Sequence, residues 1–416
     1  MIHKKHIAII GGGPAALMLA CSLDSNKFNI SLYEKNAALG RKFLVAGKGG
    51  FNLTHSEELK QFASRYDPKA FIEPFLQQFS NTDFRKWLSE IGIETYVGTS
   101  KRVFPVKGIK PIEVLKAIEN KLSQNQVSVF YQHEWKGWKN DQLVFENNHQ
   151  LIQQKADITI FALGGASWKV TGSDGTWTHY FKEKNITVNS FYPSNCAYQV
   201  NWDKDFIKKY AGSALKNAEF SCGSLKQKGE AVLTDFGIEG SGVYPLSRAI
   251  REELIPHHAP EQEMLNQVQY NSKKFAQLQI DLKPDLSFED IKSRLESKGN
   301  LSVKAVLEKK LNLTDVQIDL LKTMTSKEDY NDPEKLAAAI KALSLTVPGL
   351  APIDDAISTV GGIAVEELTK HLELKKLPQH YCIGEMIDWD APTGGYLLQA
   401  CFSMGYTLAE HLNTSL

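Results

Sequence analysis

The first apolar run of the chain ends in three consecutive glycines, and this feature constrains the fold most. Residues 7–10 (Ile-Ala-Ile-Ile) precede Gly11, Gly12 and Gly13, and an apolar segment suited to a helix begins at Pro14. A strand that turns directly into a helix is typical of a dinucleotide-binding unit: Gly11 permits the tight turn and Gly13 lets the backbone approach a pyrophosphate. Free N–H groups at the helix start favour that anion. We therefore predict cofactor contacts from Gly11, Gly13, Pro14, Ala15 and Ala16.

A second apolar run, residues 30–33, follows this helix and ends at Glu34. An acid at this point of a dinucleotide-binding unit accepts hydrogen bonds from ribose hydroxyls. A glycine-rich turn alone is weak evidence, but strand, turn, helix, strand and acid in this order predict a ribose-binding βαβ unit. The alternative is an ordinary surface glutamate at the end of a strand.

The same segment also resembles a signal peptide, because His3 to His6 are basic and an apolar stretch ends at Cys21. The glycines and Pro14 interrupt that apolar stretch, and its removal would delete the first strand and helix of the βαβ unit. No other run approaches the roughly 20 apolar residues of a membrane span. We therefore expect this segment to belong to the folded domain.

Composition limits the classes of partner. The 416 residues suffice for two or three domains, and 48 basic side chains balance 48 acidic ones. This balance argues against an electrostatic grip on nucleic acid or an anionic membrane. The five cysteines form no Cys-x-x-Cys pair and no spacing typical of a metal site, which fits a reduced compartment. We expect a cytoplasmic monomer or homodimer with a small-molecule substrate and without metal, nucleic-acid or membrane partner.

Changes of pattern along the chain predict three domains. Strands and helices alternate up to about residue 184, and residues 157–163 read as a buried parallel strand that Gly164 and Gly165 stop. Alternating apolar residues at 218–222 and 278–282 indicate antiparallel strands. Ser287 and Asp332 are typical helix starts, and Leu336, Ile340 and Leu343 would share one helix face. We predict a discontinuous domain (1–188 with 345–416), a β-rich middle domain (189–284) and a small helical domain (285–344).

The last segment of the chain repeats the pattern of the first, a buried strand followed by glycines and a helix. Residues 381–385 read as a short buried strand ending in Gly384 and Glu385, and Gly394 and Gly395 open a long apolar helix. A domain that is begun at one end of the chain and completed at the other suits a large, permanently held cofactor.

Taken in order, these motifs resemble those of the two-domain flavoproteins of the glutathione-reductase-like superfamily, and within it the bacterial BaiN/YhiN-like group. The resemblance spans nearly the whole chain. Its pieces are residues 11–16, 34–35, 40–54, 102–105, 162–165, 359–362, 384–385 and 394–396. It implies an α/β fold: a doubly wound FAD-binding Rossmann-type domain with an inserted β-barrel-like domain and a small helical domain.

The resemblance also implies which residues contact FAD. Glu34 would hold the adenosine ribose, with Arg41 and Lys42 near it and the phosphates, while the loop from Gly47 to Asn52 would run along the flavin ring. A helix starting at Gly394, Gly395 and Tyr396 would point at the pyrimidine end of the flavin. The other predicted contacts are Lys35, Gly50, Gly164, Gly165, Gly384 and Glu385.

This chain departs from the wider group beside the flavin. Where many members read Gly-Gly-Gly-Arg-Cys-Asn, residues 47–52 are Gly-Lys-Gly-Gly-Phe-Asn. The resemblance therefore places the chain in a subgroup without an agreed substrate, and bile-acid reduction, known in the group, does not carry over.

Three residues are candidates for the chemistry, and a fourth, Tyr396, is a candidate for covering the flavin. Lys48 either stabilises an anionic reduced flavin or is a solvated loop lysine. Asn52 either donates to the polar edge of the flavin or caps a turn. Arg102 either anchors an anionic substrate through its fork of donors or pairs with a carboxylate across a domain boundary. Tyr396 either covers the flavin or packs in the core.

We therefore predict an FAD-dependent oxidoreductase that acts at the flavin face on an activated C–C or C–N bond of a small molecule. NAD(P)H is the expected transient electron donor, and it would bind over the flavin because the middle segments hold no second glycine-rich strand-turn-helix unit. Two other classes stay open. One is a flavin-binding redox sensor that gates a protein partner, and the other is an RNA-modifying flavoprotein, which the balanced charge disfavours.

Overall fold

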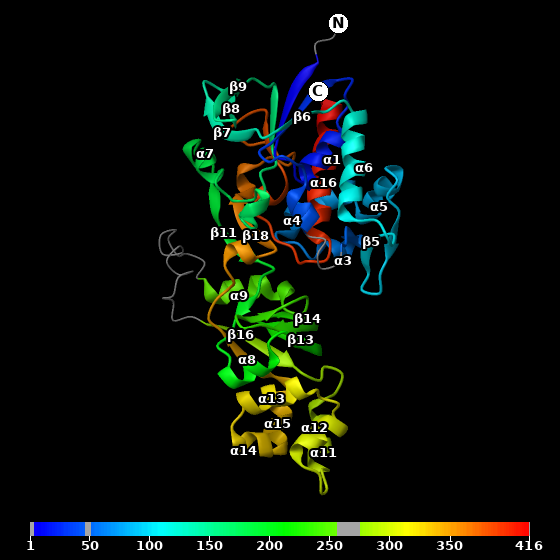
Figure 1. Cartoon of the computed structure of the whole chain (residues 1–416), viewed down its shortest axis with the longest axis vertical. Helices are drawn as coiled ribbons and strands as arrows, with labels where there is room; N and C mark the ends of the chain where they lie inside the picture. Colours follow the sequence, from blue (N-terminus) through cyan, green and yellow to red (C-terminus); the bar gives the residue numbers. More distant parts are fainter. Residues whose placement is uncertain (1–3, 46–50, 256–274, 416) are drawn as a thin grey trace. The chain divides into compact units, whose positions relative to one another are not determined.

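A computed structural model describes residues 4–45, 51–255 and 275–415 (Figure 1). The chain divides into two compact units, Met1–Tyr192 with Ile357–Leu416, and Pro193–Ala356. The first unit therefore brings the two ends of the chain together. The finer division into three domains stays a prediction.

The first unit is built on a parallel sheet with the strand order β19-β10-β1-β2-β6. Its strands are β1 (Lys5–Ile10), β2 (Phe28–Glu34), β6 (Ser128–Tyr131), β10 (Ile158–Phe161) and β19 (His380–Cys382). Each neighbouring pair runs parallel, so the carboxyl ends of these strands share one edge. The central strands read as continuous apolar runs because both faces of the sheet are covered.

Three helices of this unit are α1 (Pro14–Ser22), α6 (Pro111–Gln124) and α16 (Tyr396–Ser415). Helices α1 and α16 lie side by side (Figure 1). Gly405 permits the close approach, since a Cβ there would lie 2.3 Å from the carbonyl oxygen of Ala15. The end of the chain is thereby held against the first strand-turn-helix.

Smaller sheets and short helices complete the first unit. An antiparallel sheet of β7 (Glu134–Lys139), β8 (Gln142–Asn147) and β9 (Gln150–Gln154) connects β6 to β10. A second has the order β3 (Thr54–His55), β5 (Arg102–Pro105), β4 (Thr95–Val97), and β11 (Val188–Ser194) pairs with β18 (Ser358–Ile363). The other helices are α2 (Arg41–Val45), α3 (Leu59–Ala63), α4 (Lys69–Gln78), α5 (Asn81–Glu90) and α7 (Thr178–Glu183).

The second unit contains an antiparallel sheet with the order β12-β15-β14-β13-β16-β17. Its strands are β12 (Tyr198–Gln199), β13 (Ala214–Cys222), β14 (Leu225–Leu233), β15 (Gly237–Glu239), β16 (Ala276–Asp281) and β17 (Leu343–Val347). Beyond β17 the chain returns to β12, where the Gln199 N–H donates to the Gly349 carbonyl at 2.9 Å. This contact joins the segment after β17 to β12, the opposite edge strand of the sheet. The β-barrel-like form implied by the resemblance stays a prediction.

Helices cover this sheet and share its apolar core. They are α8 (Lys204–Tyr210), α9 (Ser247–Leu254), α11 (Phe288–Glu296), α12 (Val303–Lys309), α13 (Asp315–Met324), α14 (Lys327–Asn331) and α15 (Pro333–Lys341). Ser287 and Asp332 cap α11 and α15 as predicted. Placing Leu343 on a helix face was wrong, because residues 343–347 alternate apolar and polar and pair with β16. Within the described ranges no helix has the length and apolar character that crossing a membrane requires.

Candidate functional site

The glycine turn lies at the carboxyl end of β1. Gly11 has φ +101°, and a Cβ on it would lie 2.3 Å from the carbonyl oxygen of Ala162, so only glycine fits there. Gly13 precedes α1 with φ −82°, and the position of its absent Cβ has no heavy atom within 4 Å. Gly11 is therefore required by the fold itself, whereas Gly13 leaves open space at the start of α1.

Glu34 ends β2 and is buried, with 8% of its surface exposed. Its Oε2 accepts from the Gly12 N–H at 2.8 Å, and its Oε1 accepts from the backbone and side-chain N–H groups of Asn36 at 2.8 and 2.6 Å. A carboxylate has about four lone-pair sites, so these three bonds leave one, on Oε2. Glu34 thus fixes the glycine turn and keeps one acceptor site for a ligand.

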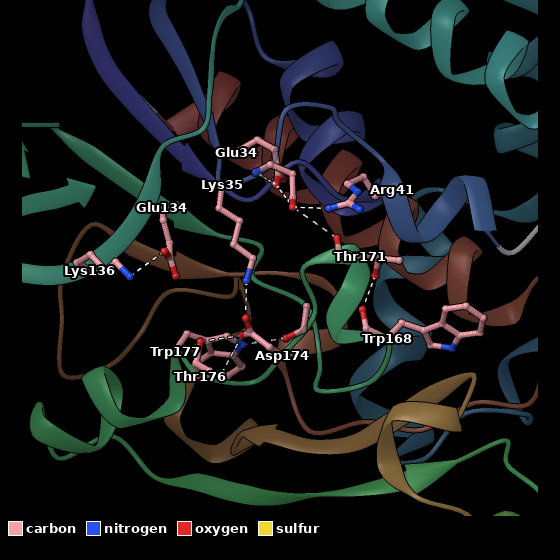
Figure 2. A network of polar contacts seen from close by, with 12 residues as sticks. Glu34, Lys35, Arg41, Glu134, Lys136, Trp168, Thr171, Asp174, Thr176 and Trp177 are labelled. Carbon is pink, nitrogen blue, oxygen red and sulfur yellow. Dashed lines mark hydrogen bonds and ion pairs between the residues drawn. The ribbon is translucent and has the colours of Figure 1, made fainter. Parts of the chain in front are cut away.

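The cations near Glu34 have partners within the chain (Figure 2). Arg41 donates to the Asn36 side chain at 2.6 Å, and Lys35 pairs with Asp174 at 2.7 Å. Burial of Asp174 opposes its ionisation, but the bonds from Lys35 and Thr176 outweigh burial and hold the pKa of Asp174 below its ordinary value. These contacts tie the segment after β2 to the segment after β10.

Lys42 and Glu385 make the corresponding link from α2 to the end of β19. The Lys42 ammonium lies 2.9 Å from Glu385 and 2.9 Å from the Ser167 hydroxyl. Glu385 also accepts from the Thr359 N–H at 3.2 Å. The predicted contacts Lys42 and Glu385 therefore come together, although 343 residues separate them.

The remaining predicted glycines follow β10 and β19. Gly164 and Gly384 have φ +73° and +80°, and a Cβ on Gly165 would lie 2.1 Å from the Thr359 hydroxyl. The Ser173 hydroxyl, beside Gly164, is buried and has no hydrogen-bond partner among the described residues. With Gly11 and Glu34, these residues line the carboxyl edge of the parallel sheet, where ligands bind in such folds.

At the other end of this region, Gly394 and Gly395 precede α16 with φ +108° and +101°. A Cβ on Gly395 would lie 2.5 Å from the Thr54 Cα, and one on Gly394 would lie 3.4 Å from the Arg102 Nε. Arg102 is half-buried, and its guanidinium has no hydrogen bond or ion pair with any described residue. The predicted Arg102 therefore lies beside the predicted Gly394 and carries an unneutralised charge.

A buried polar network under the start of α16 was missed by the sequence analysis. The Tyr396 hydroxyl donates to Glu57 at 2.7 Å, and Arg65 pairs with Glu57 at 2.7 Å. The His55 ring stacks on Tyr396, with ring centroids 5.2 Å apart. The signal was weak, because Tyr396 and Glu57 are 339 residues apart in sequence.

The network holds its members in fixed charge states. Burial opposes ionisation of Glu57, but bonds from Arg65 and Tyr396 keep its pKa below the ordinary value. Burial lowers the pKa of His55 and, with Glu57, raises the pKa of Tyr396. His55 accepts from the Glu57 N–H at Nδ1 and faces the Ser100 carbonyl at Nε2, so both ring nitrogens are engaged. The arrangement suits positioning of Tyr396 rather than proton transfer by His55.

The loop that was predicted to run along the flavin lies partly outside the described residues. Asn52 is half-buried, and its side chain has no partner among the residues that the structure describes. Gly47, Lys48 and Gly50 lie outside the described residues. In the described ranges no group of three or more His, Cys, Asp or Glu side chains is arranged to hold a metal ion.

Comparisons with known proteins identify the family. The model of the family described as HI0933-like protein Rossmann domain matches residues 5–411. The 3-dehydro-bile acid delta(4,6)-reductase of Clostridium scindens is 22% identical over 425 residues, 97% of each chain. The ribosomal RNA dihydrouridine synthase of Haemophilus influenzae is 23% identical over 410 residues, 96% of each chain.

Among solved structures, a 3-ketosteroid-delta4-(5alpha)-dehydrogenase from Rhodococcus jostii matches 98% of this chain and 97% of its own, with 12% identity and a TM-score of 0.46. The family match confirms the predicted flavoprotein family and the predicted α/β fold with a doubly wound FAD-binding Rossmann-type domain. The chain belongs to the HI0933-like family.

Proposed function

We propose that this protein holds FAD and uses it to reduce a C=C bond conjugated with a carbonyl group. The observation that carries the cofactor assignment is the pair formed by Gly13 and Glu34. Gly13 leaves room at the start of α1 for a pyrophosphate, and the remaining acceptor site of Glu34 lies at the end of the neighbouring strand, where a ribose hydroxyl would donate.

Several further residues fit the same cofactor. The Ser173 hydroxyl is buried without a partner and would gain one from the bound dinucleotide. Gly384 and Glu385 would approach the ribityl and pyrophosphate region, while the Gly394–Gly395 turn and the start of α16 would face the pyrimidine end of the flavin. There the partial positive charge of the helix start would stabilise negative charge on a reduced ring. Bound flavin, once reduced by the electron donor, would supply the hydride, and water would supply the proton that completes the reduction.

The bond type is inferred from the names of the two relatives. One is named for reducing delta(4,6) double bonds of a 3-dehydro-bile acid, and the other for making dihydrouridine in ribosomal RNA. The substrates differ, but in both the reduced C=C bond is conjugated with a carbonyl group. This shared feature falls within the activated C–C bonds expected from the sequence.

We assign Arg102 to the substrate carbonyl. A half-buried guanidinium without a carboxylate partner is free to donate to an oxygen on which negative charge develops during reduction. Its place beside Gly394 sets it at the predicted flavin end. Asn52 and Lys48 stay proposals for the same edge, and NAD(P)H stays the proposed electron donor.

The test begins with the purified protein, which we expect to be yellow and to release FAD on denaturation. Anaerobic reduction with NADH or NADPH, followed by addition of conjugated ketones, quinones or imines, should reoxidise the flavin fastest with a conjugated ketone. A colourless protein that does not take up FAD would overturn the cofactor assignment. Slow reduction by both nucleotides without substrate-dependent reoxidation would favour a redox sensor over an enzyme.

A further inference from the structure

The hairpin of β4 and β5 has a surface that the proposed chemistry leaves unused. Tyr96 and Phe104 are directly opposite in the strand register, and their rings stack with centroids 5.7 Å apart. Tyr96 is 48% exposed. Side chains two apart on a strand share a face, so Arg102 lies on the same face as Phe104. This face, defined by Tyr96, Phe104 and Arg102, is the hairpin face below.

Four cations occur within the ten residues 101–110, and the nearest acids on either side in the sequence are Glu94 and Glu113. Lys101, Lys107 and Lys110 are exposed, and Arg102 is half-buried. None of the four pairs with a carboxylate among the described residues. The chain neutralises cations elsewhere, for example Lys136 between Glu134 and Glu146. The hairpin therefore concentrates positive charge that the balanced total charge of the chain conceals.

We propose that the hairpin face binds single-stranded RNA. An exposed aromatic pair, with unpaired cations in the same hairpin and directly after it in the chain, offers what such a strand requires, because bases stack on exposed rings while lysines and arginines contact the phosphates. An acidic polypeptide would use the cations but leaves the exposed aromatic pair unexplained. Charge complementarity and stacking together therefore favour the nucleic acid.

The face also leads toward the candidate site. Arg102 is two residues from Phe104 on β5, and its Nε lies 3.4 Å from the Cβ position of Gly394. A strand stacked on Tyr96 would thus extend toward the start of α16. Presentation of an RNA base to the flavin rests on the proposed function. Binding of RNA at the hairpin face does not depend on it.

The proposal is tested by fluorescence anisotropy with a labelled single-stranded 12-nucleotide oligouridylate, using the full-length protein with its flavin content recorded. We expect Lys101→Glu/Lys107→Glu to weaken binding at least tenfold and to reduce the dependence of binding on salt concentration. The matched control, Lys139→Glu/Lys155→Glu, makes the same charge change at exposed lysines in and after the β7–β9 sheet, which Figure 1 shows on the opposite side of the unit from β5. It should stay within twofold of the wild type.

A second pair of variants separates stacking from charge. Tyr96→Ala should weaken binding about tenfold, and Tyr96→Phe, which keeps the ring, should stay within twofold. The proposal is wrong if the wild type does not bind the oligonucleotide, if both double variants lose binding equally, or if Tyr96→Ala binds normally. Equally tight binding of a labelled polyglutamate would identify an acidic protein as the partner instead. Flavin content reports on the cofactor assignment separately, so the two proposals fail independently.

Discussion

The two ends of the candidate site, around Glu34 and at the start of α16, differ in whether their cations have partners within the chain. Around Glu34, the chain supplies a partner for each cation: Arg41 bonds to Asn36, Lys35 to Asp174 and Lys42 to Glu385. At the start of α16, Arg102 has no partner among the described residues. The end around Glu34, whose cations all have partners within the chain, is suited to hold one ligand in one geometry, because its side chains need no rearrangement on binding. An unpaired cation costs little in water but gains a strong partner from an anionic or polarised ligand. We therefore connect the first end with the resident cofactor and the second with the substrate.

The glycines allow the sharpest test of this division at the cofactor end. Gly11→Ala should destabilise the protein by about 3 kcal/mol or more, because the residue has positive φ and its Cβ would overlap the Ala162 carbonyl. Gly13→Ala should leave the free energy of unfolding of the flavin-free protein within about 1 kcal/mol of the wild type, since the Cβ position is open. It should nevertheless abolish FAD retention. Urea unfolding and released flavin measure the two effects.

The comparison between the two ends of the site fails if Gly11→Ala and Gly13→Ala have the same effects on stability and FAD retention. Equal destabilisation of both variants would mean that Gly13 is also needed by the fold. Normal FAD retention by Gly13→Ala would mean that the space beside Gly13 is not used by a pyrophosphate.

The second test concerns the acid. Glu34→Ala should weaken FAD binding by about 1–3 kcal/mol, the scale of a lost hydrogen bond to a charged group, and it also leaves the Gly12 N–H without its acceptor. Glu34→Gln, which keeps the shape and one acceptor oxygen, should lose less. FAD titration into the flavin-free protein measures both. A Glu34→Ala variant with wild-type FAD affinity would remove this residue from the site.

The sequence predicted the end of the site around Glu34 better than the end at the start of α16. Gly11 and Glu34 follow local patterns, since a tight turn and a strand end impose residue types within one βαβ unit. Glu385 and Gly394 were predicted as cofactor contacts through a resemblance rather than through local physics, and those contacts stay a prediction. Leu343 was misplaced because its apolar spacing fits a helix and a strand equally in a short window.

The polar network at the start of α16 lay beyond sequence reasoning for a different reason. His55, Glu57 and Tyr396 meet only after the last helix packs against a segment more than 300 residues earlier. Their residue types are ordinary, and only the fold makes them neighbours. The cations at residues 101–110 are already neighbours in the sequence, and they were missed because total charge is an average over the chain and does not report local concentration.

Methionine keeps an unbranched side chain but removes the charge. Its substitution for the paired Lys42 and for the unpaired Arg102 should show which cation contributes to stability and which to catalysis. Lys42→Met leaves Glu385 without its ion pair and should lower the free energy of unfolding by about 1 kcal/mol. Arg102→Met should leave that free energy within about 0.5 kcal/mol and reduce kcat/KM for a conjugated ketone about tenfold. Unfolding curves and steady-state kinetics measure the two quantities. Loss of stability in Arg102→Met would show that Arg102 has a structural partner and would end its comparison with Lys42.

The smallest expected effect is the dependence of stability on pH at His55. Because burial lowers the pKa of His55 in the folded state, the unfolded chain binds the proton more readily, and stability falls as pH drops through the unfolded pKa of about 6.5. His371, His380 and His411 also have lowered pKa values and act in the same direction. Their contribution cancels when wild type and His55→Gln are compared at each pH. The wild type should therefore lose more Tm between pH 7.5 and pH 5.5, a range chosen to span about 6.5, than His55→Gln loses. Equal losses would mean that His55 titrates as freely in the folded protein as in the unfolded chain, and the start of α16 would then lack the fixed charge states that contrast with the open Arg102 beside it.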